Sequence, residues 1–261
     1  MSKNNSPPTW VSQNFLTGAK IIRRLLRKTS INSQDHIIEI GPGKGHITGV
    51  LLRRCKKVSA IEIDKSLYHR LHAKFETAGN LKLYHLDFLK WQLPAHGTYK
   101  VFANIPFCHT TDIVRKLAES INPPAEAWLT MEKGAAKRLM GIPRENALSL
   151  ILKPLFDMRV MYHFAREDFH PMPGVDVVMV HLKRKELRDI PLPQWRSYRR
   201  FVATATKNNC AGLARIFSKK QLSRACREAG LSDLVSGEIL YIQWLCLFRC
   251  YCLIKKHPSS G

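Results

Sequence analysis

The feature that constrains this chain most is a glycine-rich turn between an apolar segment and a helical one. Residues 36–40 form a short apolar run, the turn reads Gly41-Pro42-Gly43-Lys44-Gly45, and residues 45–54 have helical spacing. Glycines let the backbone bend sharply and approach a ligand closely. A tight strand-to-helix connection would use the same glycines. The turn therefore predicts an α/β unit, and other residues must decide whether it binds a ligand.

Strand and helix patterns alternate after this turn. The predicted elements are strands at 58–63, 81–86, 100–105 and 127–131 and helices at 65–77 and 111–120. Such alternation predicts a mostly parallel sheet with helices on both faces. Two later strand patterns, 159–164 and 177–182, have no long helix between them, which predicts an antiparallel pair at one edge.

A further helix is predicted from Thr17, with apolar and basic residues on opposite faces. Ile21, Ile22, Leu25 and Leu26 share one face, and the other carries Arg23, Arg24, Arg27 and Lys28.

The charge balance favours a polyanionic partner. The chain has 42 Lys and Arg against 20 Asp and Glu, a formal net charge of +22 spread along its length. A field of this sign attracts nucleic acid. An anionic membrane is the alternative, and it is disfavoured because no signal peptide, lipidation motif or spanning apolar segment is seen.

Three regions are expected along the 261 residues: a flexible basic arm at 1–12, an α/β domain at 13–190 and a small helical RNA-binding domain at 191–261. The segment Pro191-Leu192-Pro193 marks the second boundary, and basic residues with helical spacing follow it. The seven cysteines are expected to be reduced thiols of a cytoplasmic protein, because no secretory signal accompanies them. They contain no CxxC pair, so no metal site is expected.

The glycine spacing and a later glutamate favour a nucleoside ligand. The turn is GxGxG, and His46 stands where a dinucleotide-binding fingerprint has its third glycine. Glu62, at the end of the next predicted strand, can accept hydrogen bonds from both hydroxyls of a ribose, with Asp64 as the alternative acceptor. A nucleoside without a pyrophosphate, such as S-adenosylmethionine (SAM), fits this pair best.

The next two strands also end in polar residues. Asp87 can accept a hydrogen bond from the amino group of the cofactor adenine, with Phe88 packing nearby, although Asp is also a common turn residue. The following strand ends in Asn104-Ile105-Pro106-Phe107. The Asn104 amide oxygen and the Ile105 carbonyl can accept both hydrogens of a target adenine amino group, and Phe107 can stack on the base. An ordinary Asn-X-Pro turn is the alternative, and the place of the motif at the sheet edge favours the target site.

These motifs together resemble the ribosomal RNA adenine dimethylase family, which includes the Erm macrolide-resistance methyltransferases and the KsgA enzymes of the small subunit. The resemblance rests on QNFL at 13–16, EIGPGKG at 39–45, Glu62, LDF at 86–88, NIPF at 104–107 and FHPMPGVD at 169–176. It implies a Rossmann-like SAM-dependent methyltransferase domain with a small α-helical C-terminal domain. The SAM contacts that it implies fall on Asn14, Leu16, Gly41, Gly43, Glu62, Asp87 and Asn104.

The resemblance also implies the target site. Asn104 and the Ile105 carbonyl would hold the amino group, Phe107 stands where the family commonly has Tyr, and Phe169 would pack on the other face of the base. Without the family, core packing is the simpler role for Phe169. Cytosine methylation would need a nucleophilic cysteine, and Cys108 lacks a motif that would stabilise its thiolate.

The short C-terminal region and the NIPF motif favour the Erm branch. The predicted activity is therefore methylation of an adenine N6 in 23S ribosomal RNA by a cytoplasmic monomer, giving resistance to macrolide, lincosamide and streptogramin B antibiotics. The alternatives are a 16S-type dimethylase of the KsgA branch and a non-catalytic ribosomal-RNA-binding assembly factor. A DNA adenine methyltransferase is disfavoured because those enzymes usually carry a (D/N)PPY motif.

Overall fold

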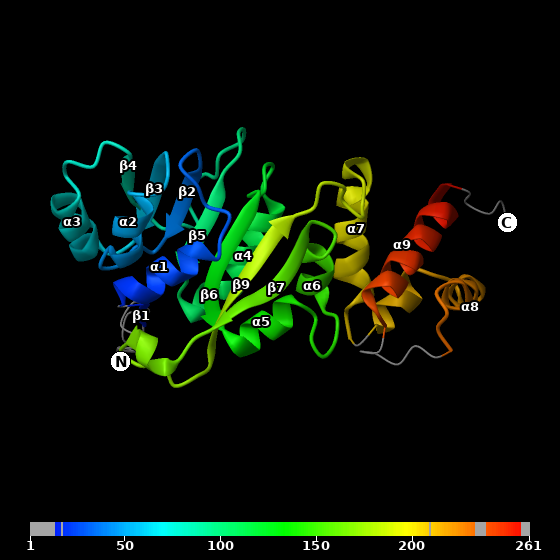
Figure 1. The fold of residues 1–261 in the computed structure, drawn as a ribbon. Helices are drawn as coiled ribbons and strands as arrows, with labels where there is room; N and C mark the ends of the chain where they lie inside the picture. The colour runs from blue at the N-terminus through cyan, green and yellow to red at the C-terminus, as the bar shows by residue number, and fades with distance from the viewer. Residues whose placement is uncertain (1–13, 17, 209, 233–238, 257–261) are drawn as a thin grey trace, which may run out of the picture. The chain divides into compact units, whose positions relative to one another are not determined.

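The computed structural model describes residues 14–16, 18–208, 210–232 and 239–256 (Figure 1). The arm predicted at 1–12 lies outside these residues, as do Gln13 and Thr17. The described chain divides into two compact units. The first comprises the described parts of Met1–Ala136 and Met158–Arg184, and the second those of Lys137–Asp157 and Lys185–Gly261.

A mixed sheet forms the centre of the first unit. Its strand order is β4-β3-β2-β5-β6-β9-β7. The strands are β2 (His36–Ile40), β3 (Lys57–Glu62), β4 (Leu81–His85), β5 (Lys100–Asn104), β6 (Glu126–Glu132), β7 (Phe156–His163) and β9 (Val177–Arg184). Strands β2 to β6 are mutually parallel, and β9 pairs antiparallel with β6. The predicted α/β fold with a mostly parallel sheet is confirmed.

Helices cover both faces of this sheet. In the view of Figure 1, α1 (Ala19–Arg27) lies in front of the strands and α4 (Thr110–Glu119) lies behind them. Two further helices, α2 (His46–Leu51) and α3 (Lys65–Lys74), follow β2 and β3. Helix α3 begins where the Asp64 side chain accepts a hydrogen bond from the Leu67 amide at 2.7 Å, a standard N-cap. The short helix α5 (Lys133–Leu139) was not predicted.

Two very short strands join distant parts of the sequence. β1 (Phe15–Leu16) pairs antiparallel with β8 (Phe169–His170), with Phe15 opposite His170 and Leu16 opposite Phe169. A 3-10 turn, η3 (Arg166–Asp168), precedes β8. The pairing brings the QNFL and FHPMPGVD segments together. A two-residue strand carries no periodicity, so this contact has no signal in the sequence.

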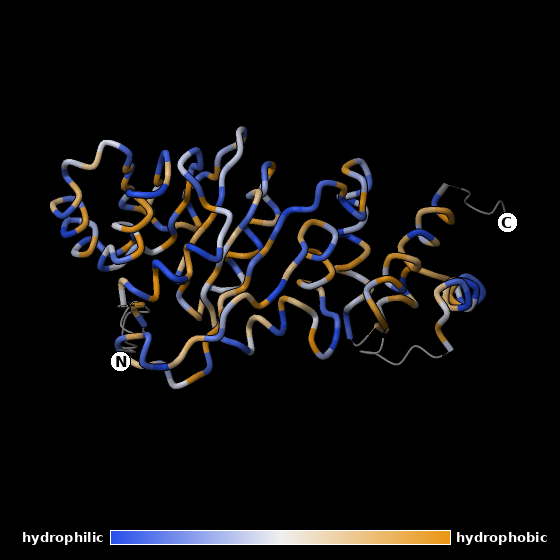
Figure 2. Tube along the Cα trace, in the orientation of Figure 1, coloured by the Kyte–Doolittle hydropathy of each residue, from blue (hydrophilic) through white to orange (hydrophobic). Residues whose placement is uncertain are grey.

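One part of the core of the first unit lies between the sheet and helices α1 and α2. Ile22, Leu25 and Leu26 of α1 are fully buried in one hydrophobic cluster with Ile47 and Leu51 of α2. Figure 2 shows hydrophobic residues concentrated along the strands beneath these helices. Burial of this apolar surface fixes the positions of the strand ends that carry the predicted site.

Polar residues at the amino ends of the strands pair with one another. The Lys100 ammonium lies 2.9 Å from the Asp35 carboxylate and 3.7 Å from Glu126, and it donates to the Ser30 carbonyl and hydroxyl, each at 3.0 Å. His181 contacts the other Glu126 oxygen at 2.7 Å. Lys100 and His181 are both buried, so this edge of the sheet is closed by its own side chains.

The second unit is helical apart from the start of β7. It contains α6 (Ala147–Leu152), α7 (Leu192–Ala205), the 3-10 turn η4 (Ala211–Arg215), α8 (Lys219–Glu228) and α9 (Tyr241–Lys256). The buried Tyr198 hydroxyl donates to the Leu150 carbonyl at 2.9 Å, which ties α7 to α6. The composition change at Pro191 gives no sign that residues 137–157 pack with this unit. No helix among the described residues is long and apolar enough to cross a membrane.

Candidate active site

Two glycines of the turn have different surroundings: Gly41 borders open space, and Gly43 is closely packed. Gly41 has φ +65°, and a Cβ built there would meet nothing within 4 Å. Gly43 has φ +56°, and a Cβ there would lie 2.6 Å from the ring of Phe15. Both backbone angles favour glycine over residues with a side chain. Gly43 is therefore required for packing, whereas Gly41 leaves room for a ligand.

Glu62 is held beneath the turn by backbone donors. Its side chain is fully buried, one carboxylate oxygen accepts from the Gly43 amide at 3.0 Å, and the other accepts from the Asp64 amide at 2.9 Å. Burial raises the pKa of Glu62, and these backbone hydrogen bonds oppose that shift. Each carboxylate oxygen can accept more than one hydrogen bond, so Glu62 retains capacity for ribose hydroxyls. The Asp64 carboxylate already caps α3.

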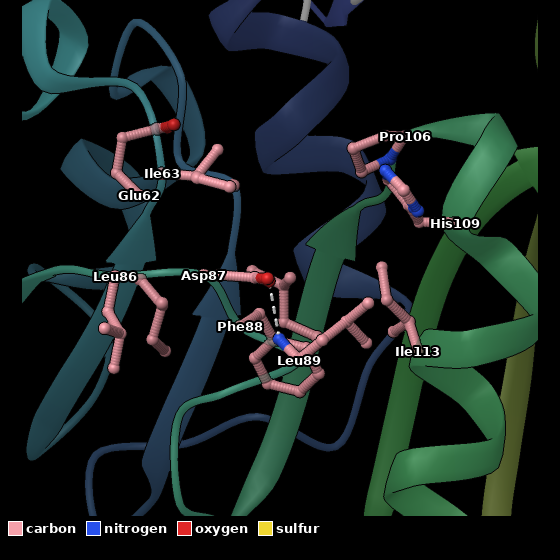
Figure 3. A pocket seen from close by; sticks show the side chains of 12 residues that line it. Glu62, Ile63, Leu86, Asp87, Phe88, Leu89, Pro106, His109 and Ile113 are labelled. Carbon is pink, nitrogen blue, oxygen red and sulfur yellow. Dashed lines mark hydrogen bonds between the residues drawn. The ribbon is translucent and has the colours of Figure 1, made fainter. Parts of the chain in front are cut away.

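Asp87 stabilises a turn with one carboxylate oxygen and keeps the other available as an acceptor. One of its oxygens accepts from the Leu89 amide at 2.8 Å, the bond drawn in Figure 3. Lys116 of α4 stabilises the same turn by donating to the carbonyls of Leu89 and Trp91, at 2.7 and 2.5 Å. No donor among the described residues reaches the second Asp87 oxygen. This oxygen is therefore available to a ligand amino group.

Glu62 and Asp87 line one pocket at the carboxyl ends of the parallel strands (Figure 3). The sequence missed most of its other wall residues: Ile63, Leu86, Leu89, Pro106, His109 and Ile113. Ile63 and Leu86 are apolar yet 55% and 41% exposed. Their side chains offer apolar contacts for a flat ring, whose polar edge would meet Asp87. In the sequence, each strand-end acid has an apolar neighbour: Ile63 follows Glu62, and Leu86 precedes Asp87. This pairing of an acid with an apolar residue at a strand end is the signal that could have identified them.

Asn104 faces a second pocket next to the first. Its amide nitrogen donates to the Asn14 carbonyl at 2.7 Å, so the orientation of the amide is fixed, and no donor among the described residues reaches its oxygen. Asn14, Phe15, Ile105 and Phe107 line this second pocket with Asn104. The first and second pockets share the wall residues Gly41 and Pro106. A ligand in one pocket would therefore lie beside a ligand in the other.

Two predicted site residues lie behind this surface. Leu16 is 3% exposed and Phe169 is 2% exposed, and neither lines either pocket. The Phe169 ring packs against Phe164, with ring centroids 5.1 Å apart. The structure therefore gives Phe169 a packing role, and its contact with a target base stays a prediction, as does the SAM contact of Leu16.

The site has no features of cysteine or metal chemistry in the described residues. Cys108 is exposed and lines neither pocket. No group of three His, Cys, Asp or Glu side chains in the described ranges is placed to hold a metal ion.

The residues present fit SAM. Gly41 leaves space beside the first pocket, Glu62 supplies acceptors for ribose hydroxyls, and Asp87 has an oxygen available for the adenine amino group. Ile63 and Leu86 supply apolar contacts for the base. The second pocket, which holds Asn104, adjoins this one.

Comparison with known proteins agrees with this geometry. The family model described as ribosomal RNA adenine dimethylase matches residues 5–229. The chain is 36% identical over 245 residues to an rRNA adenine N-6-methyltransferase of Limosilactobacillus reuteri, covering 94% of this chain and 97% of the relative. A relative of the same name from Lysinibacillus sphaericus is 33% identical over 240 residues, covering 92% and 95%.

Two solved structures show the same fold. The 23S rRNA methyltransferase ErmE matches with a TM-score of 0.76 and 25% identity, covering 92% of this chain and all of that one. A dimethyladenosine transferase from Plasmodium falciparum matches with a TM-score of 0.70 and 20% identity, covering 94% and 98%.

Fold and pocket define a SAM-dependent methyltransferase. The chain belongs to the ribosomal RNA adenine dimethylase family. The predictions of an rRNA adenine methyltransferase and of SAM as its cofactor are confirmed by this membership.

Proposed function

We propose that this chain methylates the N6 amino group of a specific adenine in 23S ribosomal RNA, which makes its host resistant to macrolide, lincosamide and streptogramin B antibiotics. The observation that carries the adenine assignment is the Asn104 amide, which is fixed by its hydrogen bond to Asn14 and lines a pocket adjoining the cofactor pocket. The likeness to ErmE, named a 23S rRNA methyltransferase, over the whole length of that chain supports the choice of RNA.

SAM supplies a methyl group on a sulfonium, which makes that carbon electrophilic. Glu62 accepts from the ribose hydroxyls and Asp87 from the adenine amino group, so the protein fixes the nucleoside at both ends. The contacts proposed for Asn14, Leu16, Gly41 and Gly43 complete this binding site.

The target adenine requires acceptors, because its amino group has two hydrogens to donate. The Asn104 oxygen and the Ile105 carbonyl accept one hydrogen each, and Phe107 stacks on the ring. Held in this way, the amino nitrogen becomes more pyramidal and directs its lone pair toward the cofactor pocket. No general base is needed for attack: as the N–C bond forms, the S–C bond of the sulfonium would break to leave a thioether, and the positively charged nitrogen would then lose its proton to water.

We further propose that the helical region 191–261 binds RNA and that the protein acts as a cytoplasmic monomer. Exposed basic residues support the first statement: Arg196, Arg200, Lys219, Lys220 and Arg227 lie on α7 and α8. These side chains offer contacts for phosphates.

Primer extension on ribosomal RNA tests this function. RNA is prepared from a macrolide-sensitive host with and without the protein, and both the 23S and the 16S molecules are scanned. We expect a new modification stop in 23S RNA only, together with macrolide resistance. A stop in 16S RNA alone would transfer the protein to the KsgA branch, and no stop in either would contradict methylation of ribosomal RNA.

A further inference from the structure

The outer face of α1 is a strip of exposed basic residues. Lys20, Arg23, Arg24, Arg27 and Lys28 are all exposed, whereas the opposite face of the helix is fully buried. The helix contains no acidic residue. We call these five residues the α1 basic strip.

The charges of the α1 basic strip are not balanced by acids. None of the five forms an ion pair with a carboxylate of a described residue, although Lys100, Lys133, Lys153 and Lys185 all do. Lys20 and Arg24 are four residues apart, as are Arg23 and Arg27, and like charges at this spacing repel each other on a helix. A polyanion bound to the strip would relieve this repulsion.

One member of the strip is held in place by an aromatic ring. The Arg24 guanidinium lies 5.7 Å from the ring centroid of Tyr162 in β7. The Tyr162 ring packs against the Phe164 ring, with centroids 4.9 Å apart, and the Phe164 ring packs against Phe169, with centroids 5.1 Å apart. These rings form a continuous row from the α1 basic strip to β8.

The row ends behind the proposed target-base pocket. Phe169 of β8 pairs with Leu16 of β1, and Asn14, just before β1, accepts the hydrogen bond from Asn104. Helix α1 begins at Ala19, three residues after β1 ends. The α1 basic strip is therefore connected, through this row of rings and through β1, to the pocket that would receive the adenine.

From this arrangement we infer that the α1 basic strip is a docking surface for the phosphate backbone of the RNA that flanks the target adenine. The inference rests on the proposed function, since it takes ribosomal RNA as the partner. Arginine and lysine on one helix face are suited to phosphates and carry no base specificity of their own. The strip thus positions the RNA, and the Asn104 pocket selects the base.

The test compares two triple variants that lose the same charge from the same unit. One carries Lys20→Gln, Arg23→Gln and Arg27→Gln on α1. The control carries Lys56→Gln, Lys57→Gln and Arg70→Gln, three exposed residues outside the strip with no ion pair among the described residues. Glutamine forms helices well, so α1 should persist. The probe is an unmethylated 23S rRNA transcript, and its binding is measured at several salt concentrations.

We expect the α1 variant to bind the transcript at least about tenfold more weakly, with a salt dependence shallower by about two to three in log–log slope. Its affinity for SAM and its melting temperature should match those of the wild type. The control should lose less than about threefold. Equal losses in both variants would overturn the inference, because net charge would then explain binding.

Direct binding separates this inference from the proposed function. If the wild type methylates 23S RNA and the α1 variant binds as the wild type does, the inference fails and the function stands. If the wild type methylates no ribosomal RNA, the function fails, and a selective loss of transcript binding in the α1 variant would still support α1 as the docking surface.

Discussion

The two edges of the sheet in the first unit treat their polar side chains differently. At the amino edge, buried Lys100 and His181 are bonded to the half-buried carboxylates of Asp35 and Glu126. At the carboxyl edge, Asp87 and Asn104 line pockets, and each has an acceptor oxygen that meets no donor among the described residues. Both edges are built from the ends of the same strands. The difference shows that polar groups paired among themselves stabilise a fold, whereas acceptors oriented by the fold and left available bind ligands.

The largest effect is expected at the amino edge. A Lys100→Met variant leaves the carboxylates of Asp35 and Glu126 without their cation, and removing one partner of a buried ion pair costs about 3–5 kcal/mol. Urea unfolding would measure this loss. The control is Lys133→Met, whose pair with Asp176 is exposed and should contribute less than about 1 kcal/mol. Equal stability of the two variants would contradict a structural role for the amino edge.

Asn104→Ala should affect turnover more than folding. It removes the acceptor proposed for the target amino group, and loss of one such positioned group costs about 10²–10³ in kcat, or about 2.7–4 kcal/mol. Single-turnover methylation with saturating RNA and SAM would measure the effect. A rate within about threefold of the wild type would show that Asn104 does not stabilise the transition state.

Asp87→Ala should weaken cofactor binding. A hydrogen bond to a charged group contributes about 1.5–3 kcal/mol, so the Kd for SAM should rise on the order of tenfold to a hundredfold. Titration calorimetry would detect this change. The matched control is Glu76→Ala, an exposed acid outside the pocket, which should leave the Kd unchanged. Similar Kd values for both variants would assign Asp87 to the turn alone.

Glu39, a buried acid at the carboxyl edge, should make the stability of the protein depend on pH. Its carboxylate lies just before the glycine turn and is 1% exposed, and burial raises its pKa to about 8 against the opposing effect of Thr48. Between pH 4.5 and 8 the folded state keeps a proton that the unfolded state loses, so Glu39 makes stability fall as pH rises, by up to about 1.4 kcal/mol per pH unit.

A Glu39→Gln variant cannot ionise and should lose this dependence. We expect it to gain stability relative to the wild type as pH rises from 5 to 8, measured by urea unfolding at each pH. Parallel curves for the two proteins would show that Glu39 is ionised in the folded state.

The sequence predicted the parallel sheet well because most of its strands are short, largely apolar runs separated by strong turn signals. The strand expected at 36–40 has the same bounds as β2, and those expected at 58–63 and 100–105 differ from β3 and β5 by one residue at the ends. Short elements were missed. Helices α5 and α6 have seven and six residues, too few for a helical period to stand out.

The site could be predicted in part because several of its residues lie at the ends of predicted strands. Glu62 and Asn104 end their strands and Asp87 lies just after one, so their common edge was evident from the order of strands. The contact of Asn14 with Asn104 depends on the β1–β8 pairing, which no local pattern encodes. The available oxygens of Asp87 and Asn104 likewise depend on where each donor lies in three dimensions.

A structure of the protein with SAM bound tests the central claim most directly. The account predicts ribose hydroxyls within hydrogen-bond distance of Glu62, the adenine amino group at the free Asp87 oxygen, and the methyl group directed toward the Asn104 amide oxygen. SAM bound outside the pocket of Glu62 and Asp87, or with its methyl directed away from Asn104, would contradict it.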